Sequence, residues 1–383
     1  MGAKVRILRV IARMNVGGPA LQITVLESNL DDAKFNHILA TGFCDEDEED
    51  FLLINQMNIG EIRIKGLGRN ISAFGDFQAF LALRKLMKEY RPNIIHTHTA
   101  KDGFLGRLAS ISLRLPHIRV HTFHGHLLYG YFSGFKLFLY LCAERILARF
   151  THRFIAVGYK VRDDLICNRI GNLEKYSVIY PGIPSPRKVS RTAALTALGL
   201  RDDINYIGWL GRVVQIKRPE RLIELAQNIK ERELGWRVFV AGDGPLKEEL
   251  QNICAARELP IDFLGWVTDL DSFFSVTKLL LLTSVNEGTP LSLIQAQLAS
   301  IPVISTRVGS VDEIVLEAET GLLIDGFGQE QIQAIMKLLE DEASINEMSL
   351  RAKEFAEGKF SIGSFIKNHE DMYLNLLTHQ SKF

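Results

Sequence analysis

The chain has 383 residues, of which 47% are hydrophobic, and this is enough apolar material for two ordinary domain cores. Lys plus Arg and Asp plus Glu both number 45, so the formal net charge is zero. A neutral chain has no global field that draws nucleic acid or an anionic surface, so any binding that depends on charge must be local.

The cysteines and the N-terminus indicate the compartment. Cys44, Cys142, Cys167 and Cys254 lie too far apart for a CxxC metal or redox motif. Basic residues interrupt the first apolar run and no cleavage site follows it, so we interpret this run as a strand and not as a signal peptide. The sequence contains no run of 18 apolar residues without charge, which argues against a membrane span. We therefore expect reduced thiols in a cytoplasmic protein, and peripheral attachment to the inner face of the plasma membrane stays open.

Short apolar runs alternate with longer amphipathic segments, which is typical of βαβ units in parallel sheets. Strand candidates in the first half lie at residues 5–12, 37–41, 61–64, 93–98, 119–123, 154–157 and 178–180. A second series lies at 206–211, 237–241, 262–265, 279–283, 302–305 and 321–324, and after about residue 328 the pattern is helical. The sequence predicts an α/β fold with two doubly wound sheets.

Three prolines and a glycine at residues 180–186 stop regular structure and predict a linker. We expect an N-terminal domain over residues 1–184 and a second domain over residues 185–360. The final segment, residues 361–383, is expected to be a helix that packs back on the N-terminal domain.

Two cations follow the strand at residues 206–211. Arg212 offers a planar fork of donors and Lys217 a compact charge, and the turn after the first strand of an α/β sheet is where ligands bind. The pair suits a diphosphate, although two solvated surface cations are the competing interpretation.

The next strand ends in Gly242-Asp-Gly244-Pro. Its glycines allow close approach of a ligand, but glycine turns also close many βα units without binding anything.

The segment from Thr283 to Gln295 carries the strongest local signal. A strand ends, the turn Glu287-Gly288-Thr289-Pro290 exposes backbone amides, and a helix begins near Pro290. Free N–H groups and a helix dipole of about half a positive charge suit a phosphate or a sugar oxygen. Glu287 is placed to accept hydrogen bonds from sugar hydroxyls. Its other interpretation is a carboxylate that favours the helix dipole.

In the first half, Gly17 and Gly18 lie between a strand and a helix that Pro19 opens, so they present amides to phosphates or form an ordinary tight turn. A metal site is an alternative for the histidines, because histidines spaced by two on a strand share a face. It is the weaker alternative, since no nearby cysteine completes a site. These histidines are His96, His98, His121, His124 and His126.

Two further segments have simple interpretations. Residues 131–153 mix aromatic residues with spaced cations, and we favour a helix packed on the sheet over one that lies on a membrane surface. The acidic run at residues 45–50 is interpreted as a solvated loop.

Taken in order, several motifs resemble glycosyltransferase family 4. They are Gly211-Arg212 with Lys217 five positions on, the AGDGP turn, FLGWVTDL at residues 263–270, and EGTPL at residues 287–291. The likeness covers essentially the whole chain, because residues 14–19 resemble the family's N-terminal glycine loop and residues 121–125 its histidine motif. The resemblance implies the GT-B fold, with two Rossmann-like domains facing a central cleft.

The resemblance also implies roles for single residues. Arg212 and Lys217 would bind the donor diphosphate, Glu287 would contact the transferred sugar, and His124 would lie near that sugar. Gln295 departs from the family, whose second glutamate typically binds the ribose hydroxyls. The glutamine keeps a carbonyl acceptor but loses the negative charge. We therefore expect about a tenfold loss of affinity for the donor. The other implied donor-binding positions are Gly17, Gly18, Gly211, Gly242, Gly244, Gly265, Trp266, Val267, Gly288, Thr289, Pro290 and Leu291.

The activity implied by the resemblance is retaining transfer of a hexosyl or N-acetylhexosaminyl group. The expected donor is a UDP-sugar and the expected acceptor a saccharide or lipid-linked saccharide, in bacterial polysaccharide or glycoconjugate assembly. No cofactor, metal or nucleic acid is expected, since Arg212 and Lys217 would replace a divalent ion. A nucleotide-sugar 2-epimerase and a non-catalytic nucleotide-sugar-binding protein are the alternatives.

Overall fold

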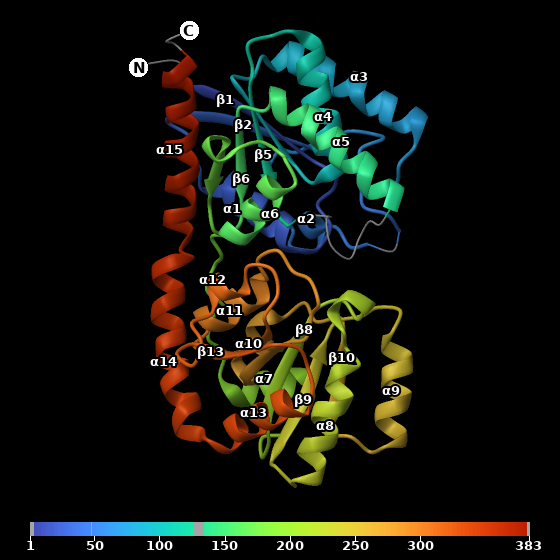
Figure 1. The fold of residues 1–383 in the computed structure, drawn as a ribbon, viewed down its shortest axis with the longest axis vertical. Helices are drawn as coiled ribbons and strands as arrows, with labels where there is room; N and C mark the ends of the chain where they lie inside the picture. Colours follow the sequence, from blue (N-terminus) through green and yellow to red (C-terminus); the bar gives the residue numbers. More distant parts are fainter. Residues whose placement is uncertain (1–3, 47, 126–133, 381–383) are drawn as a thin grey trace. The chain divides into compact units, whose positions relative to one another are not determined.

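The computed structural model describes residues 4–46, 48–125 and 134–380. The chain divides into two compact units, one formed by Met1–Ile183 with Ile362–Phe383 and the other by Pro184–Ser361. Each unit contains one parallel sheet with helices packed on it (Figure 1). The predicted α/β class with two doubly wound sheets is therefore confirmed.

The sheet of the first unit has the order β3-β2-β1-β4-β5-β6-β7, and all of its strand pairs are parallel. The order reverses between β1 and β4, and we call this place the switch point of the sheet. The strands are β1 (Val5–Ile11), β2 (Phe35–Thr41), β3 (Ile62–Arg63), β4 (Ile94–His98), β5 (Ile118–Phe123), β6 (Arg153–Ala156) and β7 (Tyr176–Val178).

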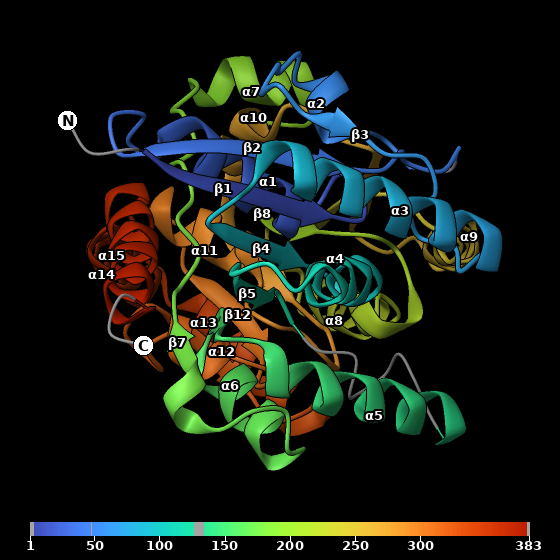
Figure 2. The ribbon, with the colours of Figure 1, turned by 90° about the horizontal axis from the view of Figure 1, so that it is seen from above.

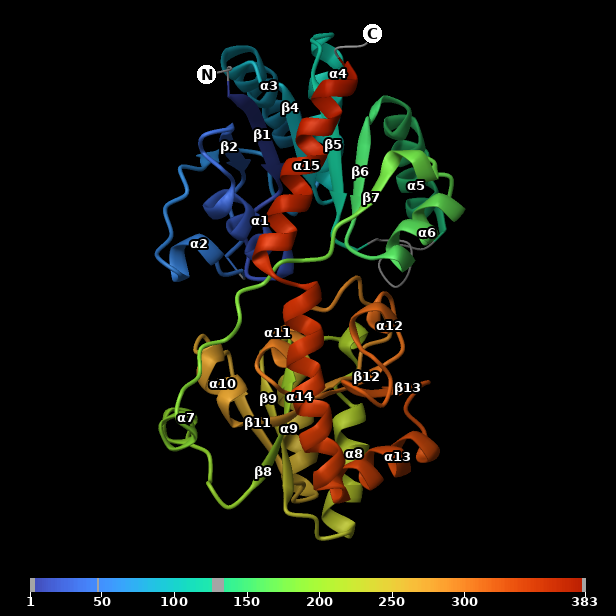
Figure 3. The ribbon, with the colours of Figure 1, turned by 90° about the vertical axis from the view of Figure 1, so that its left-hand side faces the viewer.

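Helices cover both faces of this sheet, because successive side chains of a strand point to opposite faces. Ile7 packs with α1 and α15, whereas its neighbour Leu8 packs with α3 and α4. Figure 2 shows α4 between α3 and α5, and Figure 3 shows α15 lying along the sheet. The helices are α1 (Gly18–Asn29), α2 (Phe51–Ile54), α3 (Ala73–Tyr90), α4 (Ala100–Leu113), α5 (Gly134–Phe150), α6 (Tyr159–Cys167) and α15 (Ile362–Gln380).

The sheet of the second unit has the order β10-β9-β8-β11-β12-β13, with its switch point between β8 and β11. Its strands are β8 (Asn205–Leu210), β9 (Trp236–Ala241), β10 (Ile261–Gly265), β11 (Thr277–Leu282), β12 (Val303–Thr306) and β13 (Gly321–Ile324). Its helices are α7 (Arg191–Leu198), α8 (Arg221–Glu231), α9 (Lys247–Ala256), α10 (Leu270–Val276), α11 (Leu291–Leu298), α12 (Val311–Ile314), α13 (Gln329–Glu340) and α14 (Glu342–Lys359).

Polar side chains set several helix starts. Ser72 before α3, Ser190 before α7 and Asp269 before α10 each accept a backbone N–H of the first turn. Such caps satisfy donors that have no partner inside the helix and contribute about 1 kcal/mol each.

The segment at residues 131–153 forms α5 from Gly134 onward, and residues 131–133 lie outside the described residues. One face of α5 packs on the unit through Leu147 and through Glu144, which accepts two hydrogen bonds from Arg107 of α4 at 2.7 and 2.9 Å. The opposite face exposes Phe135 and Phe138. Along the described chain, no helix is long and apolar enough to span a membrane.

The interpretation of residues 45–50 as a solvated loop is wrong for two of its carboxylates. Glu48 pairs with Arg13, and Asp50 accepts a hydrogen bond from Arg63 at 2.7 Å and caps α2. Both carboxylate side chains are less than 10% exposed. Residue 47 lies outside the described residues. The paired cations come from distant positions in the chain, which no local pattern reveals.

The pair between Arg107 and Glu144 gives a test of how α5 is held. Both side chains are buried, so Glu144→Leu leaves an uncompensated guanidinium. We expect this variant to lower the free energy of unfolding by about 3–5 kcal/mol, measured by urea denaturation. The double variant Arg107→Met with Glu144→Leu is expected to recover most of the loss.

Glu89→Ala, which removes the exposed partner of Lys85, serves as the control and is expected to leave the unfolding midpoint unchanged. Equal destabilisation of the single and double Glu144 variants would contradict a role for buried charge at this contact.

Candidate functional site

The second unit brings Lys217 and Glu287 together at its switch point. Lys217 belongs to the loop after β8 and Glu287 to the loop after β11, and these strands are neighbours in the sheet. The Lys217 ammonium donates to Oε1 of Glu287 at 2.5 Å, and the Ser284 hydroxyl donates to the same oxygen at 2.6 Å. The crevice at the carboxyl ends of such strands is where α/β sheets bind ligands.

A buried network fixes the loop that carries Lys217. The Trp209 indole N–H donates to Oγ1 of Thr283 at 2.9 Å, and Oγ1 of Thr283 donates to the carbonyl of Lys217 at 2.7 Å. Arg221 donates to the carbonyl of Thr283 at 2.7 Å. Local sequence patterns indicate no individual role for Trp209, Thr283, Ser284 or Arg221. The available signal was that Thr283 and Ser284 are the first polar residues after the apolar run of β11.

Three glycines of this unit are required by contacts between loops. A Cβ on Gly242 would lie 1.9 Å from the carbonyl oxygen of Gly211, and a Cβ on Gly244 would lie 2.5 Å from that of Val213. Gly309, which the sequence analysis did not single out, has a φ of 55°, and a Cβ there would lie 1.9 Å from the carbonyl oxygen of Glu287. These glycines pack the loops of the site against one another.

The remaining cations lie on neighbouring loops. Arg212 is exposed, and within the described residues its guanidinium takes part in no side-chain hydrogen bond or ion pair. Lys247 of α9 was not predicted; it donates to Asp243 at 2.7 Å, and its Nζ is 3.4 Å from the position of a Cβ on Gly265. Beside Gly265, Trp266 is 43% exposed.

The turn before α11 is also fixed. Pro290 is the residue before the helix, Leu291 is its first residue, and the carbonyl of Gly288 accepts from the backbone N–H of Ser310 at 2.9 Å. Gln295 lies on α11 and is half-buried.

In the first unit, Gly17 differs from the glycines that packing requires. A Cβ on Gly17 would meet no atom closer than 3.9 Å, to Asn15 and Pro19. Gly18 begins α1 and Pro19 follows it. Because contacts do not demand glycine at position 17, the loop after β1 keeps open space beside its backbone.

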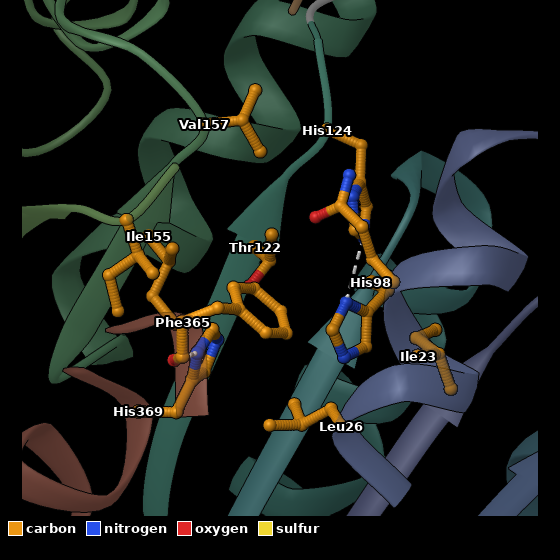
Figure 4. A pocket seen from close by; sticks show the side chains of 11 residues that line it. Ile23, Leu26, His98, Thr122, His124, Ile155, Val157, Phe365 and His369 are labelled. Atoms are coloured by element: carbon orange, nitrogen blue, oxygen red, sulfur yellow. Dashed lines mark hydrogen bonds between the residues drawn. The ribbon is translucent and has the colours of Figure 1, made fainter. Parts of the chain in front are cut away.

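His124 follows β5 and is hydrogen-bonded to His98 at the end of β4. Nε2 of His124 lies 2.9 Å from Nδ1 of His98, and the rings stack with centroids 5.1 Å apart (Figure 4). Loss of contact with water lowers the pKa of His124 to about 4 and holds the pKa of His98 well below its usual range. Both rings are therefore neutral near pH 7 and share one N–H between them.

The histidines do not gather on one face. His96 bonds Tyr373 and Thr122, each at 2.7 Å, whereas His121 lies on the opposite face and contacts Oγ1 of Thr97 at 2.8 Å. His126 lies outside the described residues. Among the residues that the structure describes, no group of three or more His, Cys, Asp or Glu is arranged to hold a metal ion.

The two halves of the chain each match a family model. Residues 16–187 match Glycosyltransferase Family 4, and residues 190–357 match Glycosyl transferases group 1. The chain belongs to the group 1 glycosyltransferases of the GT-B fold.

Curated relatives of this glycosyltransferase extend over most of its length. A UDP-Gal:alpha-D-GlcNAc-diphosphoundecaprenol alpha-1,3-galactosyltransferase of Escherichia coli is 28% identical over 328 residues, which are 82% of this chain and 83% of the relative. The capsular polysaccharide biosynthesis glycosyltransferase CapM of Staphylococcus aureus is 24% identical over 81% of this chain and 83% of its own length.

Solved structures share the fold of this glycosyltransferase. HepE of Anabaena in complex with UDP and glucose superposes with a TM-score of 0.80 at 20% identity, over 96% of this chain and 99% of that one. Sucrose-phosphate synthase of Thermosynechococcus elongatus gives a TM-score of 0.80 at 17% identity, over 98% and 100%. At this identity the likeness shows the fold alone.

Two residues that the sequence analysis missed lie at the switch point of the first unit of this glycosyltransferase. Thr99 has φ 59° and ψ 167°, a region that glycine alone adopts readily, so it stores about 1–3 kcal/mol of strain. Asp102, in the first turn of α4, is fully buried, and neither of its carboxyl oxygens has a hydrogen-bond partner among the described residues. Burial raises the pKa of Asp102 to about 7.

The raised pKa of Asp102 makes stability depend on pH. Unfolded Asp has a pKa of about 3.9, so the neutral carboxyl favours the fold below about pH 4, and this contribution is lost as the pH rises towards 7. Asp102→Asn stays neutral throughout. The Tm of the variant minus that of wild type is expected to grow between pH 4 and pH 8, by about 2–4 °C for each kcal/mol that charging the carboxyl costs.

Asp371→Asn removes an exposed carboxylate on α15 and is the matched control, for which a nearly constant difference is expected. A pH-independent difference in Tm for Asp102→Asn would show that Asp102 is ionised throughout this range.

Proposed function

We propose that this glycosyltransferase transfers a hexosyl or N-acetylhexosaminyl group, with retention, from a UDP-sugar to an acceptor hydroxyl. The observation that carries the proposal is the contact of Lys217 with Glu287 at the switch point, on the same loop as the exposed guanidinium of Arg212. This places two cations and an anchored carboxylate where an α/β sheet binds its ligand.

The two cations suit the leaving diphosphate. Arg212 provides a planar fork that can bind two phosphate oxygens, and Lys217 provides a compact charge held by the Trp209–Thr283 network. Negative charge grows on the diphosphate as the glycosidic bond breaks, so cations fixed in advance stabilise the transition state. We propose that these cations act in place of a divalent metal ion.

The reacting bonds need no protein nucleophile. The bond from the anomeric carbon to the diphosphate breaks, a bond to the acceptor oxygen forms on the same face, and the acceptor proton passes to the departing diphosphate. Glu287, held by Ser284 and Lys217, is proposed to orient sugar hydroxyls, and neutral His124 to lie beside the sugar ring. These residues act by orientation and electrostatics.

One relative and one solved structure support the substrate classes. The Escherichia coli relative is named for UDP-Gal and for a diphosphoundecaprenol-linked acceptor, and HepE was crystallised with UDP and glucose. We propose that the acceptor is a lipid-linked saccharide in bacterial polysaccharide assembly. Product analysis separates the alternatives, since a 2-epimerase alters the donor without an acceptor and a non-catalytic binding protein releases no UDP.

Donor binding and turnover test the diphosphate site. The Tm is measured with a panel of nucleoside diphosphates and UDP-sugars. We expect the uridine ligands of this panel to raise the Tm of wild type, and we expect Arg212→Ala to abolish the shift. Lys217→Ala is expected to lower kcat by about 100- to 1000-fold, measured as UDP release with a lipid-linked acceptor.

Lys230→Ala removes a partly exposed lysine of α8 that lies outside the proposed site, and its turnover is expected to match wild type. Turnover in excess EDTA is also expected to be unchanged. Full activity of Lys217→Ala would contradict its role, and activity that EDTA removes and added metal restores would contradict the proposal of metal-independent transfer.

A lipid-linked acceptor requires contact with a membrane, and an apolar surface of the first unit suits that contact. Phe135 and Phe138 of α5 are 72% and 56% exposed, and Phe74 and Phe77 of α3 are 73% and 58% exposed. The helix α4 contacts both α3 and α5 (Figure 2). Exposed Lys136 adds positive charge beside the aromatic residues. Such a mixture binds the interface of anionic bilayers.

Flotation with anionic vesicles tests this surface. Wild type is expected to float with the vesicles, and the double variant Phe135→Ser with Phe138→Ser is expected to stay in the soluble fraction, because it removes apolar area that enters the bilayer. Leu350→Ser, which changes a 77% exposed leucine of α14, is the control and is expected to float like wild type. Failure of wild type to float would exclude the membrane contact.

A further inference from the structure

Neutral His124 has one ring nitrogen that no described group occupies. Its Nε2 is occupied by the hydrogen bond to His98, and its Nδ1 is buried without a partner among the described residues. A neutral imidazole carries one N–H, so the nitrogen that holds the proton decides whether Nδ1 donates or accepts. Whatever fixes the shared proton therefore fixes how His124 meets a sugar.

His98 is itself held firmly. Its ring lies against that of His96, with centroids 4.2 Å apart and the planes tilted by 36°. His96 is anchored on both nitrogens by Tyr373 of α15 and Thr122 of β5. The small cavity beside the pair is lined by apolar Ile23, Leu26 and Phe365 (Figure 4). The second nitrogen of His98, Nε2, has no hydrogen-bond partner among the described residues. The bond to His124 is thus the hydrogen bond that orients the His98 ring.

We propose that His98 is a positioning residue that fixes the orientation of His124 and couples the tautomers of the two rings, leaving Nδ1 of His124 to meet the donor sugar. This rests on the proposed function, because it assigns His124 its place beside the transferred sugar. The ring contact of His96 with His98 links Tyr373 of α15 to the end of β5, so a helix late in the chain supports the side chain of His124.

The groups that face the pair keep it neutral. Loss of contact with water is the main cause of the lowered pKa of both rings, and the positive charge of Arg9 on β1 also lowers the pKa of His98. A neutral pair has two N–H groups, one of which occupies the shared hydrogen bond. The remaining N–H is either on Nε2 of His98 or on Nδ1 of His124, so the two outer nitrogens have opposite donor and acceptor roles.

Amide variants of His98 separate positioning from packing. The side-chain amide of His98→Asn reaches the place of Nδ1, whereas that of His98→Gln reaches the place of Nε2, and His98→Leu has neither. We expect His98→Asn to keep kcat within about threefold, and His98→Gln and His98→Leu to lose about 10- to 100-fold with little change in the donor KM. Equal kcat values for the Asn and Gln variants would overturn the proposal.

The imidazole nitrogen spectrum of His124 tests the proposal without any substrate. In ¹⁵N-labelled wild type, we expect the Nε2 shift of His124 to be that of a hydrogen-bonded nitrogen, and in His98→Leu we expect it to move to the value of a nitrogen without that bond. Unchanged His124 shifts in His98→Leu would overturn the positioning role. Absence of sugar transfer by wild type would overturn the proposed function instead, and the spectra would still decide the role of His98.

Discussion

The reversal of strand order in each sheet is the constraint on which both candidate sites depend. At the first switch point, α1 after β1 packs on one face and α4 after β4 on the other, so the two loops separate and leave the carboxyl ends of neighbouring strands open. The same order in the second unit joins residues 70 positions apart, Lys217 and Glu287. Local sequence supplies the chemical groups, and sheet topology decides which of them meet.

Burial of polar groups gives these loops their rigidity. Thr283 and Trp209 are fully buried, and their hydrogen bonds hold the backbone of Lys217 while its ammonium stays partly exposed. An unpaired polar group at such depth costs about 1–3 kcal/mol, so each alternative position of the loop is unfavourable. The buried histidines of the first unit follow the same principle, because both ring nitrogens of His96 are hydrogen-bonded, one to Tyr373 and one to Thr122.

Much of the fold was predictable because strands buried on both faces read as continuous apolar runs, as in residues 279–282. Helix starts were predictable where Pro19 and Pro290 lie beside them. Contacts between distant residues were not, since nothing near Glu48 indicates Arg13 and nothing near His98 indicates His124 as its partner. Motif resemblance predicted the candidate site residues of both units. Ser284, Gly309 and Asp102 could not be predicted, because their importance depends on contacts and burial that only the folded loops show.

The two candidate sites differ in charge for a physical reason. In the second unit, the cation Arg212 is exposed and the cation Lys217 contacts the carboxylate of Glu287. In the first unit, the loss of water keeps His98 and His124 neutral. Under the proposed function, the cations of the second unit would compensate the charge of a diphosphate. A neutral imidazole such as His124 would be suited to a sugar hydroxyl, because it does not repel the positive charge that develops at a sugar ring.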